Sequence, residues 1–189
     1  TGDATLNASD VTFGSTIDGD GVTPRTLTVN TSGNGLTSFG GAVGDTERLS
    51  AVTTNADGQT NIGSAAFNLN GAATSDFGDN VLLTGNVVID QDGTGDIQFS
   101  GTVDSQTGNN FSLTVNVASG TAIFSGDIGQ DALGATSQDD GLGALTVDGL
   151  ALVGAAGAVD ITTTGAQTFR AGTRAVSYTH LRAHETSGY

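Results

Sequence analysis

DVTFGSTID at residues 10–18 returns as DIQFSGTVD at residues 96–104, and LTVN at residues 27–30 returns unchanged at residues 113–116. Both pairs are separated by the same offset (96 − 10 = 86; 113 − 27 = 86). In LTVN, apolar and polar side chains alternate, and this period of two is typical of a strand with one buried face. A fixed period between such segments predicts a stacked array of β units rather than a globule around a pocket.

The composition also indicates an all-β protein. The chain has 189 residues, including 30 Gly, one Pro and no Cys, Met or Trp. Val, Ile, Thr and Phe favour strands, whereas Gly, Asn and Asp favour turns. The strand signals follow one another too closely for helices to lie between them, which excludes a doubly wound α/β fold. We expect strands at residues 4–7, 11–13, 26–30, 49–54, 60–62, 66–70, 80–84, 86–90, 96–99, 111–117, 121–124, 144–148, 150–153 and 159–164.

Two all-β architectures fit this pattern. In a parallel β-helix, or β-solenoid, each unit of about 86 residues coils into about four turns with apolar side chains inside. In the alternative, each unit is one Ig-like β-sandwich, since about 100 residues suit that fold. A sandwich usually contains a large buried aromatic anchor, yet the chain has no Trp and no Tyr before Tyr178. We therefore favour the β-solenoid.

The last stretch of the chain differs in composition from the rest. VSYTHLRAHET at residues 176–186 resembles a peptide found at the ends of unrelated metagenomic proteins, where sequencing-adapter DNA has been translated in frame. We interpret residues 175–189 as a non-native tail and leave them out of the fold. The alternative is a genuine polar tail. This stretch holds every histidine and tyrosine of the chain: Tyr178, His180, His184 and Tyr189.

The predicted organisation follows from the repeat and the tail. Residues 1–174 form a fragment of a longer β-solenoid, with two imperfect repeats at residues 10–95 and 96–174. Residues 175–189 lie outside it. A cut solenoid exposes unpaired strand edges that end repeats normally cover.

The chain is strongly acidic, with a formal net charge of −15 from 20 acidic and 5 basic residues. Such a surface repels nucleic acids and anionic lipids, so neither is expected as a partner. No apolar run reaches the roughly 18 residues of a membrane helix, so we expect no membrane insertion of this segment. The absence of cysteine excludes disulfides and thiolate metal sites. The acidic charge then serves solubility outside the cell or the binding of divalent cations.

One turn is a candidate metal site. DQDGTGD at residues 90–96 places Asp90, Asp92 and Asp96 around glycines, and calcium takes six to eight oxygen ligands that alternating aspartates can supply. No glutamate follows at the spacing of an EF-hand loop. The turn therefore predicts a calcium site, with solvated turn-forming aspartates as the alternative. No other cofactor is expected.

No arrangement of residues points to catalysis. Before the tail, the chain contains no His and no Lys, and its basic residues are Arg25, Arg48, Arg170 and Arg174. Adjacent carboxylates are expected by chance in so acidic a chain. Since function has to be argued from a site, we predict no enzymatic activity.

Several short modules resemble the repeat of very large bacterial surface proteins. They are FGGAVG at residues 39–44, FSGTVD at 99–104, FSGDIG at 124–129, LGALTVDG at 142–149 and DITTTGAQTF at 160–169. The repeat is similar to that of β-strand-repeat proteins such as filamentous-haemagglutinin-type adhesins and autotransporter passengers. The resemblance implies export, a parallel β-helix rod and a role in adhesion or surface display. It assigns no ligand or catalytic residue.

We therefore expect a structural or adhesive segment of a large exported bacterial surface protein, located outside the cell or on its surface. The expected partners are glycans or proteins on a host or neighbouring cell, or further copies of the protein. The alternative is a calcium-dependent carbohydrate-binding module.

Overall fold

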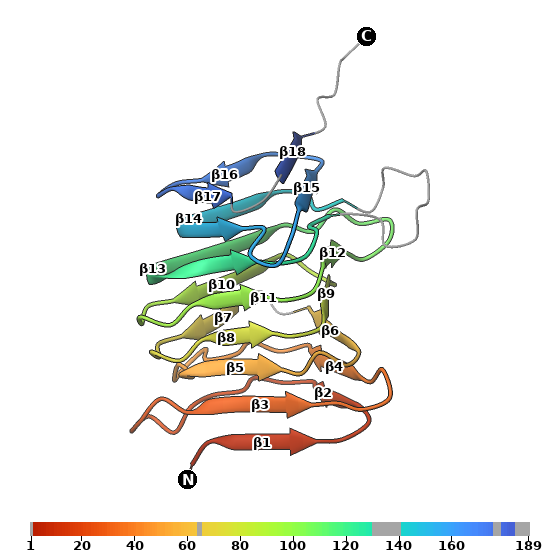
Figure 1. Cartoon of the computed structure of the whole chain (residues 1–189). Coiled ribbons are helices and arrows are strands. Elements are labelled where there is room, and N and C mark those ends of the chain that lie inside the picture. Colours follow the sequence, from red (N-terminus) through yellow and green to blue (C-terminus); the bar gives the residue numbers. More distant parts are fainter. Residues whose placement is uncertain (1, 64–65, 130–140, 176–178, 184–189) are drawn as a thin grey trace.

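The chain winds into a parallel β-solenoid of about seven turns (Figure 1). The structure, a computed structural model, describes residues 2–63, 66–129, 141–175 and 179–183. No helix forms in these residues, and none is therefore long and apolar enough to cross a membrane. The strands are β1 (Ala4–Asn7), β2 (Val11–Phe13), β3 (Thr26–Asn30), β4 (Leu36–Phe39), β5 (Ala51–Thr54), β6 (Gln59–Ile62), β7 (Ala66–Leu69), β8 (Ser75–Phe77), β9 (Asn80–Leu83), β10 (Val87–Gln91), β11 (Ile97–Phe99), β12 (Val103–Ser105), β13 (Leu113–Phe124), β14 (Leu145–Val153), β15 (Val159–Thr163), β16 (Gln167–Phe169), β17 (Thr173–Ala175) and β18 (Thr179–Ala183).

Every strand pair in the described part of the chain is parallel. The prediction of a parallel β-solenoid is thus confirmed. The alternative of tandem Ig-like sandwiches is wrong, because their sheets are built from antiparallel strands.

The strands of successive turns lie above one another in three stacks. The first stack contains β1, β3, β5, β8, β11, the second halves of β13 and β14, and β17. The second stack runs through β2, β4, β6, β9 and β12, and then through Ile128 to β15 and β18. The third stack runs through β7, β10, the first halves of β13 and β14, and β16. Each complete turn adds one segment to each stack.

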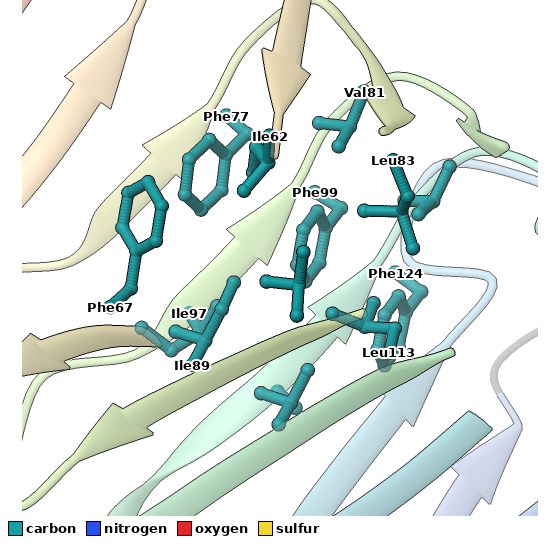
Figure 2. Packing of buried hydrophobic residues seen from close by; sticks show 14 of the residues in the cluster. Ile62, Phe67, Phe77, Val81, Leu83, Ile89, Ile97, Phe99, Leu113 and Phe124 are labelled. Carbon is teal, nitrogen blue, oxygen red and sulfur yellow. The ribbon is translucent and has the colours of Figure 1, made fainter. Parts of the chain in front are cut away.

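Alternation along the strands fills the interior with apolar side chains. In β3, for example, Leu27 and Val29 are buried, while Thr28 between them faces outward. Figure 2 shows how such side chains from different strands meet inside the solenoid. Six phenylalanines form a continuous row through the core, with neighbouring ring centroids 5.1 to 6.0 Å apart: Phe13, Phe39, Phe67, Phe77, Phe99 and Phe124. Contacting rings at these distances leave little empty space along the axis.

The 86-residue spacing is not a whole number of turns. Phe13 in the second stack is followed four turns later by Ser105, which is 92 residues on (105 − 13 = 92). Phe99, its equivalent in the sequence repeat, lies in the first stack instead. Likewise, LTVN at residues 27–30 lies in the first stack and LTVN at residues 113–116 in the third. The sequence therefore repeats a strand module and not a position in the coil.

Aspartate and asparagine residues at the start of a strand or bridge, or just before it, link each turn to the next. Asp10 precedes β2, and its Oδ1 accepts a hydrogen bond from the Leu36 N–H at 2.8 Å. Asp96 precedes β11, and its Oδ1 accepts one from the Thr121 N–H at 2.8 Å. Both copies of the repeat thus keep an aspartate that satisfies a backbone donor at a corner. The same contact joins Asp3 to Thr26, Asn80 to Thr102, Asn86 to Ser112 and Asp127 to Asp160.

Part of the predicted tail lies in the solenoid. The backbone of Thr179–Ala183 forms β18, which pairs in parallel with β15. Residues 176–178 and 184–189 fall outside the described residues. The non-native origin of residues 175–189 stays a prediction.

Candidate functional site

The corner between the third and first stacks brings acidic and basic side chains together. Asp90 is the last outward-facing residue of β10, and Asp92 follows directly after the strand. Nη2 of Arg48 lies 3.1 Å from Oδ2 of Asp90 and 3.1 Å from Oδ2 of Asp92. Nη1 of Arg48 donates to the carbonyl oxygens of Leu69 and Asp90, at 3.3 and 3.4 Å. Two of the three predicted calcium ligands thus meet around a guanidinium group.

The third predicted ligand, Asp96, has a different role. Its carboxylate is the acceptor for the Thr121 N–H, and it takes no part in the contact with Arg48. Within the described residues, no three His, Cys, Asp or Glu side chains gather closely enough to hold a metal ion. Calcium binding at Asp90, Asp92 and Asp96 stays a prediction.

Calorimetric titration with calcium tests that prediction directly. A site that uses Asp92 should lose binding heat in Asp92→Asn, whereas Asp45→Asn removes an exposed carboxylate nearby and should not change it. Absence of heat and of any shift in melting temperature in the parent protein would exclude the site.

The corner loop at residues 18–25 is held by hydrogen bonds to one aspartate. Oδ1 of Asp20 accepts hydrogen bonds from the Val22 and Thr23 N–H groups, both at 3.1 Å, and Oδ2 accepts one from Nε of Arg25 at 3.0 Å. The two backbone donors, and after them Arg25, lower the pKa of Asp20 to about 2. Asp20 therefore stays ionised at ordinary pH and fixes the loop. The loop presents Val22 to solvent with 86% of its surface exposed.

A groove of about 370 Å³ opens beneath this loop. It lies where the corner loops of the first three turns stack, since Gly19 N–H donates to the Glu47 carbonyl and Asn70 N–H to the Leu49 carbonyl, each at 2.8 Å. Its lining residues are Gly21, Val22, Thr23, Pro24, Thr46, Glu47, Arg48 and Asn70.

Sequence reasoning missed this groove because its walls come from three turns that are remote in the sequence. One signal was available: residues 14–25 form a long interval between two expected strands and contain the only proline of the chain, Pro24. Such an interval indicates an extended corner loop, although it does not reveal what lies beneath it.

A second unexpected group is a carboxyl inside the solenoid. Asp79 is only 4% exposed, and its Oδ1 accepts hydrogen bonds from the hydroxyls of Thr54 at 3.1 Å and Thr60 at 2.6 Å. Burial raises the pKa of Asp79, because removal from water disfavours the charged form. Its Oδ2 is buried without a hydrogen-bond partner. Asp79 is thus a group whose protonation state bears on stability.

No family model, no curated protein and no solved structure matches the chain.

Proposed function

We propose that the chain is a structural and adhesive segment of a large exported bacterial surface protein and acts without catalysis. The observation that carries the proposal is the filled interior. The row of phenylalanine rings continues from Phe13 to Phe124 without a break, so the coil is solid along most of its length. A solid coil of stacked turns suits the projection of a surface, and partners then meet its outer faces.

The outer faces are regular. On the third stack, Asn68, Asp90, Asn116 and Asp148 occupy equivalent outward positions in four successive turns. Neighbouring members of such a row are about 4.8 Å apart, the spacing between paired strands. Asn68 and Asn116 offer amide groups at alternate positions of this row, whereas Asp90 and Asp148 contact Arg48 and Arg170. A regular polar row of this kind favours multivalent contact with another surface.

Charge narrows the class of partner. With a net charge of −15, the protein repels nucleic acids and anionic lipids. The proposed partners are therefore glycans or proteins on a host or neighbouring cell, or further copies of the protein. The proposed location is the bacterial cell surface or its surroundings.

Adhesion is tested with beads that carry the covalently attached protein and are incubated with cells. We expect more bound cells than on beads that carry the heat-unfolded protein or an unrelated protein of similar negative charge. Periodate treatment of the cells removes glycan partners and protease treatment removes protein partners. Equal binding to all three kinds of beads would contradict the proposal.

A second candidate is a calcium-dependent carbohydrate-binding module. The observation in its favour is that the Asp90 and Asp92 carboxylates meet at one corner next to the groove, where calcium would have to displace the guanidinium of Arg48. A glycan array probed with and without a chelator separates the candidates. Glycan binding that the chelator abolishes would support this module, whereas a calcium-independent signal would favour the first proposal.

A further inference from the structure

The groove beneath residues 18–25 has walls that are fixed before any ligand arrives. Asp18 Oδ1 accepts hydrogen bonds from the Thr46 N–H at 2.8 Å and the Glu47 N–H at 3.3 Å, which joins the two loops. Asp20 fixes the upper loop through Val22 and Thr23, as described above. A preformed concave site loses little conformational entropy on binding.

One glycine brings the two walls close together. Gly21 has φ of +71°, a left-handed conformation that glycine adopts without strain. A Cβ atom at this position would lie 3.3 Å from Oε1 of Glu47. The absence of a side chain at Gly21 therefore leaves the Glu47 carboxylate open to the groove.

The lining combines polar atoms with a small aliphatic surface. Thr23, Thr46, Glu47 and Asn70 line the groove, and their side chains form no hydrogen bond with other described residues. Val22 and Pro24 supply apolar contact beside them. Hydroxyl, amide and carboxylate groups next to aliphatic carbon suit a ligand that itself alternates hydroxyl groups with C–H surface.

Electrostatics excludes an anionic ligand. The two arginines close to the groove are already neutralised: Arg25 pairs with Asp20 at 3.0 Å, and Arg48 pairs with Asp90 and Asp92. Glu47 adds to the lining a carboxylate that forms no ion pair with another described residue. A phosphate, sulfate or carboxylate ligand would therefore meet net negative charge.

We propose that this groove binds a neutral sugar residue, the end of a glycan chain on another surface. The Glu47 carboxylate and the Asn70 amide hydrogen-bond to its hydroxyl groups, and Val22 packs against its C–H face. The volume of about 370 Å³ lies within the range of small-molecule sites and suits a site for one or two sugar units. The inference rests on the proposed adhesive function and assigns the contact with the glycan to this groove.

The test is NMR titration of the whole chain with glucose, galactose, mannose and N-acetylglucosamine, each added separately. We expect at least one sugar to shift the backbone amide signals of Val22, Thr23, Thr46 and Asn70, with a Kd of about 1 mM. Glu47→Gln and Asn70→Ala should each weaken binding about fivefold, because each removes one hydrogen-bonding partner.

Two matched variants serve as controls. Asp45→Asn removes an exposed charge next to the groove without changing its lining, and Asn116→Ala removes an amide from the outward row of the third stack. Both should bind the sugar within twofold of the parent protein. Melting curves establish that all four variants are folded.

Several outcomes would overturn the inference. These are the absence of shifts with all four sugars, shifts confined to other faces, or unchanged affinity in both groove variants. If the four neutral sugars do not bind but glucosamine does, and added salt weakens its binding, then the ligand is cationic and the proposal of a neutral sugar is wrong. If beads adhere to cells while the groove variants alter neither sugar affinity nor adhesion, the inference fails and the adhesive function stands. If the groove binds sugar while beads do not adhere, the adhesive function fails.

Discussion

At the scale of single residues, the solenoid depends on ring contacts in its core. Phe99 is 1% exposed and stacks between Phe77 and Phe124, with centroid distances of 5.3 and 5.2 Å. The ring planes of Phe99 and Phe124 differ by only 2°. Parallel pairing holds the two residues in equivalent positions of adjacent turns, and this register produces the stacking.

Replacement of Phe99 by alanine should lower the free energy of unfolding by about 3–5 kcal/mol, because it leaves a cavity between two turns. Urea denaturation followed by circular dichroism measures the change. Val22→Ala, at a position with 86% exposure, is the control and should change stability by less than about 0.5 kcal/mol. Similar losses of unfolding free energy in both variants would show that the row of phenylalanine rings does not stabilise the core.

Asp79 makes a pH-dependent contribution to stability. Burial raises its pKa above 3.8, the usual value of an aspartate, so the folded chain holds the proton more tightly than the unfolded chain. The stabilising contribution of the proton is therefore complete below pH 3.8 and is lost as the pH rises through the folded-state pKa.

Asp79→Asn should remove this dependence, because the amide does not ionise and can still accept a hydrogen bond from a threonine hydroxyl. We expect the parent protein to lose stability relative to the variant as the pH rises from acid to neutral. Urea unfolding of both proteins across this range measures the difference, with Asp45→Asn as an exposed control. A stability difference between parent and Asp79→Asn that does not vary with pH would contradict the assignment.

At the scale of elements, the unit of construction is a short strand with an aspartate or asparagine before it. The unit can occupy any of the three stacks, because at each corner the side chain before the strand accepts a hydrogen bond from a backbone N–H of the next turn. Asp10 before β2 and Asp96 before β11 show this in the second and first stacks.

Asp96→Ala should destabilise the protein by about 1–3 kcal/mol, because the Thr121 N–H loses its acceptor at a partly buried corner. Asp96→Asn keeps an oxygen at the same place and should retain most of that stability. Chemical denaturation without added metal compares the two variants. Equal losses of stability in both variants would mean that the negative charge of Asp96 stabilises the protein, and not its hydrogen bond with the Thr121 N–H.

Strands could be predicted from the sequence where apolar side chains fill the inward positions, as Leu27 and Val29 do in β3. β8 was missed, because its inward positions hold Ser75 and Phe77. Ser75 is buried without loss since its Oγ accepts a hydrogen bond from the Val52 N–H at 3.0 Å, a partner from another turn. Inward polar residues of this kind weaken the alternation on which the prediction depends.

The role of a turn aspartate is likewise invisible in the sequence. Asp90, Asp92 and Asp96 lie within seven residues, and their spacing fits a calcium loop. In the structure, Asp90 and Asp92 contact Arg48, which is 42 residues before Asp90, while Asp96 contacts Thr121. A solvated turn, an ion pair and a backbone cap all use the same residue type, and only the distant partner distinguishes them.

At the scale of the whole molecule, turns of unequal length conceal the coil in the sequence. Phe13 to Phe39 spans 26 residues, whereas Ile62 to Leu83 spans 21 (39 − 13 = 26; 83 − 62 = 21). Insertions at corners, such as residues 18–25, change the length of a turn without disturbing the stacks. A repeat search therefore finds the strand modules, while the number of residues per turn emerges only from the pairing.

The central claim is that successive turns stack one above another, and distances along one stack test it most directly. Thr5, Thr28, Thr53, Asp76, Gln98, Ile123 and Leu152 occupy one outward row of the first stack. The chain lacks cysteine, so pairs of engineered cysteines can carry spin labels without interference. Electron paramagnetic resonance on labels at Thr5 and, in turn, Gln98, Ile123 and Leu152 should give backbone separations of about 19, 24 and 29 Å, at about 4.8 Å per turn. Distances that do not increase with the number of turns would contradict the stacked coil.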